Sequence, residues 1–206
     1  MNLKGRTILV TGGSAGIGLA LAETLVELGN EVVITGRTQT TLDAAVAKIP
    51  ALKAIRCDHA SIADVEQLAA TIDSNYPALD VLINNAGVFI YRNLTTRQDD
   101  LAELTRELDI NVAGPIRTVS VLVDRLRANK GTIINVSSGL AFVPIQAGPI
   151  YCATKAALHS YTISLRQQLA GAVDVIELMP PAVKTRLTAS MPEDGDFKML
   201  TTDQLV

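Results

Sequence analysis

Thr7–Gly18, with the sequence TILVTGGSAGIG, joins a short apolar run to a glycine-rich turn. The run is nearly continuous, as is typical of a strand buried on both faces of a sheet. The segment that follows, Ile17–Leu28, carries apolar residues at helical spacing and stops before Gly29, which predicts a helix. We therefore expect a strand, a tight turn and a helix whose unpaired N–H groups face the turn.

The same alternation continues along the chain. Helical patterns include Ile150–Leu169 and a segment from Ser61, which forms a capping box with Asp64, to about Ser74. A third pattern, Gln98–Ala128, contains Gly114-Pro115, where we expect a kink or a break. The other predicted strands are Glu31–Thr35, Leu52–Cys57, Leu79–Asn84, Gly131–Val136 and Val173–Leu178. Strands that alternate with helices predict an α/β fold, a doubly wound parallel sheet with helices on both faces.

The composition fits a single domain over residues 1–206. Hydrophobic residues make up 48% of the chain and charged residues 19%, which excludes a disordered protein. A net charge of −3 without a basic stripe argues against nucleic-acid binding. No apolar segment is long enough for a signal peptide or a membrane span. The two cysteines suggest neither a disulfide framework nor a metal site. We expect a cytoplasmic protein.

The glycine-rich turn has the properties of a phosphate-binding loop. Its glycines let the backbone turn tightly and approach a pyrophosphate, and the helix N-terminus offers N–H groups and a positive dipole end to the anion. A turn with packing duties alone is the alternative. The expected contacts with a dinucleotide are made by Gly12, Ser14, Ala15, Gly16, Ile17 and Gly18.

The residues after the second predicted strand bear on the choice of dinucleotide. NAD-binding proteins commonly place an acidic residue there to accept a hydrogen bond from the ribose 2′-hydroxyl. This chain has Gly36-Arg37 instead, and a guanidinium suits a 2′-phosphate, so we expect NADP(H) rather than NAD(H). An ordinary surface arginine is the alternative. Asp58, after the third strand, either accepts from the adenine amino group or forms an Asx turn before Ser61.

Polar residues also follow the fourth and fifth predicted strands. Asn84-Asn85-Ala86-Gly87 ends the fourth and Ser137-Ser138 ends the fifth. Tyr151 and Lys155 come next, and their i, i+4 spacing places both on one face of a helix. A cation about 4 Å from a phenol supplies roughly 4 kcal/mol at an effective dielectric of about 20, enough to lower a tyrosine pKa from about 10 to about 7. We therefore expect Tyr151 to exchange a proton with a carbonyl or alcohol oxygen.

Together, these motifs resemble those of the short-chain dehydrogenase/reductase family. The resemblance covers nearly all of the chain, and it implies a Rossmann fold and an oxidoreductase that uses NADP(H). It also implies four catalytic residues, which occur here in the family's order and spacing: Asn111, Ser138, Tyr151 and Lys155.

The resemblance implies a role for each of these four residues. Tyr151 is the acid/base, and Ser138 hydrogen-bonds the substrate oxygen. Lys155 holds the nicotinamide ribose and lowers the pKa of Tyr151. Asn111 anchors a water molecule that continues a proton relay from Lys155. Ser137 is the less favoured serine, because the family's serine lies thirteen residues before the tyrosine, as Ser138 does. Other cofactor contacts are implied at Arg37, Asp58, Asn85, Ala86, Gly87, Val183 and Thr185.

Two features depart from the family's pattern. Pro180–Thr185, PPAVKT, replaces the usual P-G-x-V-x-T, so Pro181 fixes φ near about −65° and excludes a positive-φ turn. The Val183 N–H and the Thr185 hydroxyl can still reach the nicotinamide carboxamide. The double proline resembles oxidoreductases that accompany D-alanylation of cell-wall teichoic acids. The chain also ends at Val206, where the resemblance implies the rest of a helix and a seventh strand.

Two segments indicate the kind of substrate. Val88–Leu94 and Gly139–Gln146 are expected near the substrate and are mainly apolar, which favours an apolar carbonyl compound or alcohol. Met191, Phe197 and Met199 either line a lid or fill a surface loop.

The last predicted strand leaves one sheet edge unpaired, so either a partner chain covers it or the chain is a fragment. The resemblance implies a homodimer or homotetramer formed through Gln98–Ala128 and Ile150–Leu169.

Two other functions are compatible with parts of this pattern. A dinucleotide-sensing regulatory protein can share the fold, because fold does not fix function. The complete set of four catalytic residues argues against a sensor, which needs no proton relay. A sugar-nucleotide epimerase shares the tyrosine and lysine but needs a larger C-terminal substrate domain than this chain has room for.

Overall fold

Six parallel strands form one sheet in the computed structural model, which describes residues 3–98, 100–189 and 199–205. Their order is β3-β2-β1-β4-β5-β6, which confirms the predicted doubly wound α/β fold. The strands are β1 (Thr7–Val10), β2 (Glu31–Gly36), β3 (Lys53–Arg56), β4 (Leu79–Asn84), β5 (Thr132–Val136) and β6 (Asp174–Leu178). The strand order reverses between β1 and β4, and ligands of such sheets bind at the strand carboxyl ends beside this switch point.

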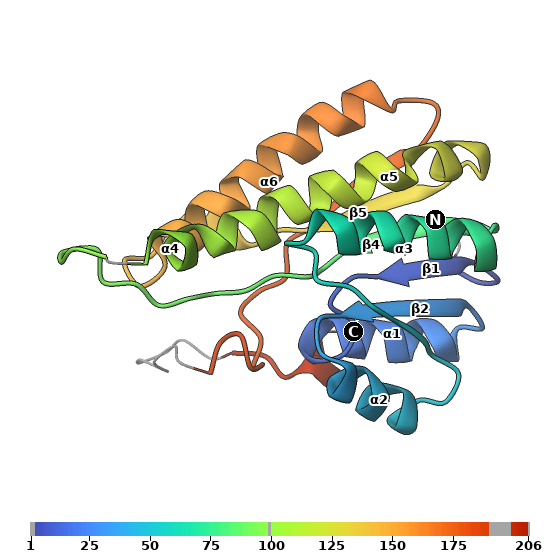
Figure 1. Cartoon of the computed structure of the whole chain (residues 1–206), viewed down its shortest axis with the longest axis horizontal. Helices are drawn as coiled ribbons and strands as arrows, with labels where there is room; N and C mark the ends of the chain where they lie inside the picture. The colour runs from blue at the N-terminus through green and yellow to red at the C-terminus, as the bar shows by residue number, and fades with distance from the viewer. Residues whose placement is uncertain (1–2, 99, 190–198, 206) are drawn as a thin grey trace.

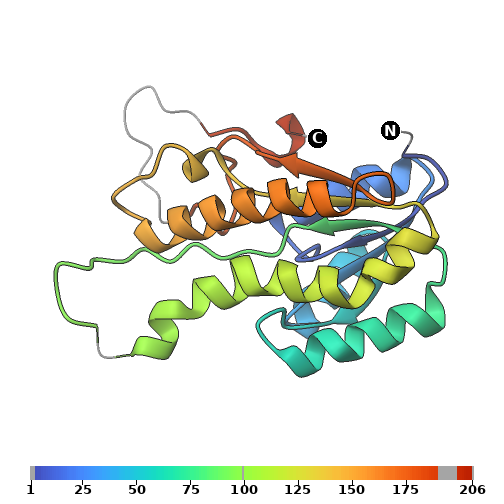
Figure 2. The ribbon, with the colours of Figure 1, turned by 90° about the horizontal axis from the view of Figure 1, so that it is seen from above.

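Helices cover both faces of the sheet (Figures 1 and 2). One face carries α1 (Gly16–Glu27) and α2 (Gln39–Lys48). The other face carries α3 (Ile62–Asn75), α5 (Gly114–Ala128) and α6 (Pro149–Gln168). The α5 helix continues from α4 (Leu101–Leu108) through a π-helical turn, η1 (Asp109–Ala113). Figure 2 shows α4 reaching past the end of the sheet.

Alternate residues of β1 point to the two helix layers. Ile8 and Val10 pack with the apolar residues of α1 and α2, whereas Leu9 packs with those of α3 and α5. All three side chains are fully buried. This two-sided burial explains why the strand is an unbroken apolar run rather than an alternating one.

The helix predicted over Gln98–Ala128 begins later than expected. Its first helical residue is Leu101, because the Asp100 side chain caps α4 by accepting a hydrogen bond from the Glu103 N–H at 2.8 Å. The predicted capping of α3 is confirmed, since Ser61 Oγ accepts from the Asp64 N–H at 3.2 Å.

The irregularity expected at Gly114-Pro115 lies one turn earlier. The chain stays helical through Pro115, and in η1 the Gly114 N–H donates to the Asp109 carbonyl, five residues back. Pro115 has no N–H to donate to the carbonyl of Asn111, so the regular α-helical bonding is interrupted at that residue.

The sheet ends at β3 on one side and at β6 on the other. Ile176 and Leu178 of β6 are 38% and 36% exposed, and in the described part of the chain no strand pairs with the outer edge of β6. After β6 the chain turns back, Val183 bridges to Leu200, and the short helix η3 (Thr202–Gln204) packs against α1. Met199 is buried, whereas Met191 and Phe197 lie outside the described residues.

Within residues 3–98, 100–189 and 199–205, no helix is both long enough and apolar enough to cross a membrane.

Candidate active site

The glycine-rich turn lies at the switch point between β1 and β4. Gly12 has a φ of 65°, and a Cβ atom on it would stand 2.8 Å from the Cα of Ala86, which follows β4. Gly16 has a φ of 56° at the start of α1. Both positions need glycine, since L residues with a side chain rarely adopt such angles. The turn therefore leaves its backbone uncovered where a ligand would approach.

Hydrogen bonds hold the β4 end against this turn. Thr11 Oγ1 accepts from the N–H groups of Asn85 and Ala86 at 3.0 and 2.9 Å. The Asn85 side-chain amide donates to the Thr11 carbonyl at 2.9 Å. The predicted contacts Asn85, Ala86 and Gly12 thus lie together, and Thr11 is a positioning residue that the sequence analysis missed.

The N-terminus of α1 has the features of an anion site. Its N-cap residue is Ala15, which has no side chain that can cap the helix, and the first turn contains no acidic residue. The first N–H groups of a helix have no partners within it, so those of α1 are available to an anion. Together with the bare glycine backbone, this end of α1 fits a dinucleotide pyrophosphate.

The residues proposed to bind the adenosine half lie beside this loop. Arg37 is exposed after β2, and its side chain has no hydrogen bond or ion pair among the described residues. A Cβ atom on Gly36 would stand 2.9 Å from Ser14 Oγ, so Arg37 follows directly on a residue that contacts the phosphate-binding turn. Asp58 forms the Asx turn that was its alternative role, with Oδ1 accepting from the Ala60 N–H at 3.0 Å.

Tyr151 and Lys155 lie in the first two turns of α6, both buried, at 7% and 5% exposure. The predicted shared face is present, since Lys155 Nζ lies 5.5 Å from the centroid of the Tyr151 ring. Lys155 Nζ also donates to the Val136 carbonyl, at the end of β5, at 2.9 Å. The lysine is therefore fixed between the sheet and the tyrosine.

The pKa expected for Tyr151 is wrong in direction. Burial raises the pKa of Tyr151 to about 12, and interaction with the Ser138 side chain opposes this only in part. Burial also lowers the pKa of Lys155, to about 8. The sequence estimate assumed a cation near the phenol oxygen, whereas Lys155 Nζ lies over the ring and is bound to a carbonyl. Desolvation is then the largest influence on the phenol.

The two serines after β5 have different partners. Ser138 Oγ accepts from the Leu140 N–H at 3.1 Å, and its side chain interacts with Tyr151. Ser137 Oγ donates to the Glu177 carboxylate on β6 at 2.5 Å, and the same carboxylate contacts His159 Nδ1 at 2.8 Å. Ser138, the serine favoured by its spacing, is thus the one that lies at the tyrosine.

Asn111 is fully buried in η1 and faces the same region. Its side chain accepts from the Val88 N–H at 2.8 Å and donates to the Val88 carbonyl at 2.9 Å and to Thr154 Oγ1 at 3.1 Å. A Cβ atom on Gly87 would stand 3.3 Å from Asn111 Oδ1 and 3.7 Å from Lys155 Nζ. The structure thus brings Gly87, Asn111 and Lys155 together.

The segment after β6 approaches the site from the other side. A Cβ atom on Gly16 would stand 3.3 Å from Thr185 Cγ2, so Thr185 lies beside the phosphate-binding turn. Val183 is buried through its bridge to Leu200. Pro181 causes no backbone strain, because Lys130 is the one non-glycine residue with positive φ in the described part of the chain.

Two further residues contact this region: Phe89, from the segment Val88–Leu94 that was expected near the substrate, and Glu107, which the sequence analysis missed. The Phe89 ring packs edge-on against Tyr151, with 5.1 Å between ring centroids. Glu107 is 0% exposed and accepts from the Ile90 N–H at 3.0 Å. The sequence offers one clue to the location of Glu107. The residue lies four positions before Asn111, which places both side chains on the same face of a helix. In the described residues no cluster of three or more histidine, cysteine or acidic side chains is placed to hold a metal ion.

Comparison with known proteins gives concordant matches. Residues 6–196 match the family model described as short chain dehydrogenase. The chain is 41% identical over 189 residues to "Uncharacterized oxidoreductase DltE" of Bacillus subtilis (strain 168), covering 91% of this chain and 75% of that protein. It is 32% identical over 192 residues to an uncharacterized oxidoreductase of Staphylococcus aureus (strain MW2), covering 91% and 82%.

Solved structures resemble the whole described fold. A short chain dehydrogenase from Burkholderia cenocepacia J2315, in complex with NADP, is 27% identical with a TM-score of 0.85, covering 98% of this chain and 81% of that chain. A 3-ketoacyl-(acyl-carrier-protein) reductase from Brucella melitensis, complexed with NADH, is 28% identical with a TM-score of 0.90, covering 98% and 87%.

Proposed function

The chain belongs to the short-chain dehydrogenase family, and from that membership we propose that it transfers hydride between NADP(H) and a carbonyl compound or secondary alcohol. The observation that carries this proposal is the convergence of four side chains from the segment after β5, from η1 and from α6. They are Asn111, Ser138, Tyr151 and Lys155. A regulatory dinucleotide sensor would have no use for this set.

The preference for NADP(H) rests on the adenosine side of the site. Arg37 is an exposed cation after β2, and no acidic residue stands there to accept from a 2′-hydroxyl. A guanidinium pairs well with a phosphate dianion. The similar Burkholderia structure contains NADP and the Brucella structure contains NADH, so both cofactors occur among the chain's relatives.

The chain's own residues supply orientation and the proton. The nicotinamide ring supplies or accepts the hydride. With its raised pKa, Tyr151 holds its proton at neutral pH, which suits donation to the oxygen of a carbonyl as that oxygen gains charge. Ser138, beside Tyr151, hydrogen-bonds the same oxygen. Lys155 would hold the nicotinamide ribose, and Asn111 would support the path by which Tyr151 regains its proton.

The test is NADPH oxidation with a panel of ketones, aldehydes and quinones, run beside the Tyr151→Phe variant. We expect at least one carbonyl to be reduced by the unmodified protein and to be reduced far more slowly by the variant. Fluorescence titration with NADPH should give similar affinities for the two proteins. Tight NADPH binding with no turnover above the Tyr151→Phe level would support the sensor instead.

A further inference from the structure

The segment that follows β4 lies along α4 and η1 in a regular register. Val88 bonds to the Asn111 side chain, and the Ile90 N–H donates to Glu107 Oε1. The Arg92 guanidinium then donates to the carbonyl of Glu103 at 2.7 Å. Each step of two residues along the segment thus matches a step of four along the helix. Two extended residues span about 6.6 Å and four helical residues about 6 Å, so this register can be maintained.

Glu107 is the middle one of the three helix residues in this register, and its carboxyl group is buried. The residue is 0% exposed, and its second oxygen, Oε2, has no hydrogen-bond partner. Arg92 Nε is likewise buried and has no hydrogen-bond partner. Burial raises the pKa of Glu107, and Arg92 acts in the opposite direction. A buried carboxyl group is costly in an apolar environment, so an apolar residue would serve better here if packing were its whole role.

Val88 and Ile90 face α4 and η1, whereas Phe89, between them, faces Tyr151. Phe89 alternates with Val88 and Ile90, and its ring packs edge-on against Tyr151. The ring also lies over Gly148, where any Cβ atom would collide with it. The Arg92 N–H donates to the Ala147 carbonyl at 3.4 Å, which joins the segment to the loop before α6. Phe89 is therefore confined between the α4 side and the start of α6.

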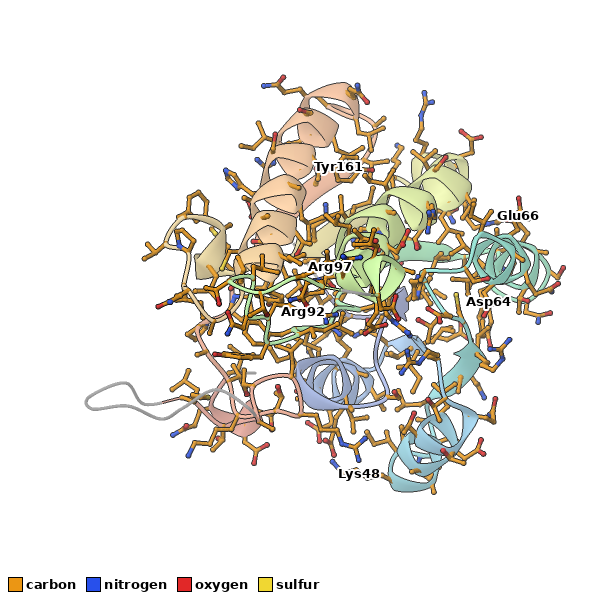
Figure 3. All side chains as sticks on the ribbon, turned by 60° about the vertical axis from the view of Figure 1, so that its left-hand side comes forward. Lys48, Asp64, Glu66, Arg92, Arg97 and Tyr161 are labelled. Atoms are coloured by element: carbon orange, nitrogen blue, oxygen red, sulfur yellow. The ribbon has the colours of Figure 1, made fainter. Side chains whose placement is uncertain are left out.

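Figure 3 shows Arg92 near the middle of the face where α4 and the start of α6 come forward. Lys48 and Glu66 lie at the rim of the same view. Glu107 is also close enough to Tyr151 to influence the pKa of the phenol, so the polar contacts of Glu107 and Arg92 lie close to the candidate active site.

We propose that Glu107 is a positioning residue for the substrate pocket. By holding Ile90, with Arg92 anchored one step further on, it keeps Phe89 as an apolar wall beside Tyr151. The pocket would then favour carbonyl substrates that carry an apolar group next to the reacting carbon. This inference rests on the proposed oxidoreductase function, since it assigns the specificity of that same site.

The first test needs no substrate. Amide hydrogen exchange at residues 88–92 should accelerate in Glu107→Leu, because the Ile90 N–H loses its acceptor, and in Glu107→Asp, whose shorter side chain does not reach. Glu107→Gln retains an acceptor oxygen and should exchange as the unmodified protein does. Glu66→Leu, on the exposed side of α3, is the matched control. Unchanged exchange at residues 88–92 in both Glu107→Leu and Glu107→Asp would overturn the positioning role.

The second test measures kcat and KM on carbonyls that differ in the size of the apolar group. A lost hydrogen bond is worth ~1 kcal/mol, so KM for the bulkier substrates should rise about fivefold in Glu107→Asp, with the KM for NADPH unchanged. Glu107→Gln should restore the normal value. Because the effect passes through Phe89, Glu107→Asp should add less than about twofold in a Phe89→Ala background.

The outcomes separate this inference from the proposed function. An equal effect of Glu107→Asp with and without Phe89 would show that Glu107 does not act through that ring, and the proposal would be wrong. If the unmodified protein turns over no carbonyl, the proposed function fails and the specificity role fails with it. The exchange measurement would still decide whether Glu107 anchors the segment.

Discussion

Burial acts in opposite directions on the two ionisable side chains at the start of α6. It raises the pKa of the Tyr151 phenol to about 12 and lowers that of the Lys155 ammonium to about 8. Each shift favours the neutral form, as desolvation does. At neutral pH the site therefore contains a protonated phenol next to a lysine that is still mostly charged but titrates far closer to neutrality than an exposed lysine.

Removing the Tyr151 hydroxyl should abolish proton donation and leave the fold in place. In Tyr151→Phe the ring that packs against Phe89 is retained. General acid catalysis is typically worth ~10²–10⁴-fold, so we expect turnover to fall at least about 100-fold while NADPH affinity changes by no more than a few-fold. Steady-state kinetics and a fluorescence titration measure the two quantities. Retention of most activity would contradict the mechanism.

The serine pair provides the control for this prediction. Ser138→Ala should lose turnover with little change in NADPH affinity, because Ser138 lies at Tyr151. Ser137→Ala should keep more of the turnover. The Ser137→Ala substitution should instead lower the free energy of unfolding, because the Glu177 carboxylate loses a buried hydrogen bond. The opposite pattern would mean that the catalytic serine has been misassigned.

Lys155 should make stability depend on pH in a defined window. Because its folded-state pKa of about 8 lies below its ordinary 10.5, the unfolded chain binds more protons between these values. Lys155 should therefore contribute a rise in the free energy of unfolding of roughly 2 kcal/mol between about pH 8 and pH 10. Cys57, Tyr151 and Tyr161, whose pKa values burial raises, act in the opposite direction in this window, so the contribution of Lys155 is the difference between the unmodified protein and Lys155→Met. Urea denaturation of both proteins across this window measures it, and identical pH slopes for the two proteins would show that Lys155 titrates normally.

Arg37 should decide between the two nicotinamide cofactors. Its exposed guanidinium offers charge to a 2′-phosphate, so NADPH should bind at least about tenfold more tightly than NADH, or ~1.4 kcal/mol. Arg37→Asp should reverse this order, because a carboxylate repels the phosphate and accepts from a 2′-hydroxyl. Isothermal titration with both cofactors tests the prediction. Equal affinities in the unmodified protein would rule out this role for Arg37.

At the scale of elements, the contact between the β1–α1 turn and the end of β4 can be tested by a matched pair of glycine substitutions. Gly12 and Gly5 have nearly the same φ, 65° and 69°. A Cβ atom on Gly12 would press on the Ala86 backbone, whereas one on Gly5 would meet nothing within 4 Å. Both Gly→Ala changes carry the same ~1 kcal/mol conformational cost.

Gly12→Ala should therefore lower the thermal midpoint more than Gly5→Ala does, and it alone should weaken NADPH binding. Differential scanning calorimetry and a binding titration measure these effects. Similar losses in the two variants would mean that the turn can move away from Ala86 without cost.

Elements with a strong local signal were predicted from the sequence. The six strands were identified from apolar runs, and the N-cap of α3 from Ser61; the reciprocal half of the expected capping box is absent, because the Ser61 N–H donates to the Asp58 carbonyl. A kink or break was expected at Gly114-Pro115, but the helix continues there and the irregularity is the π-helical turn at Asp109–Ala113, because the proline has no N–H for the carbonyl four residues before it. Glu107 was missed because its partner, Ile90, contributes only a backbone N–H. The pKa of Tyr151 needed the degree of burial, which spacing alone does not give.

At the scale of the whole molecule, the exposed outer edge of β6 favours self-association. No described strand pairs with this edge, and Ile176 and Leu178, which project from one face of β6, are partly exposed. Open apolar edges promote pairing with another chain, so we predict that a partner chain covers this edge at micromolar concentration, whereas the homodimer or homotetramer expected from the family would form through Gln98–Ala128 and Ile150–Leu169. Light scattering measures the mass, and Ile176→Lys should shift it toward the monomer if the edge is part of the interface. A stable soluble monomer would contradict the prediction.

The strand order also has a consequence for the course of folding. β1, β2 and β3 follow one another in the chain and pair as neighbours, so this half of the sheet closes short connections. β1 gains its other neighbour only from β4, whose last residue is Asn84. Contacts between distant parts of a chain form late, because their loop-closure entropy is larger. A nascent chain that has not yet released β4 from the ribosome would thus lack the Asn85–Gly87 side of the dinucleotide site and gain less stability from dinucleotide than the complete sheet does.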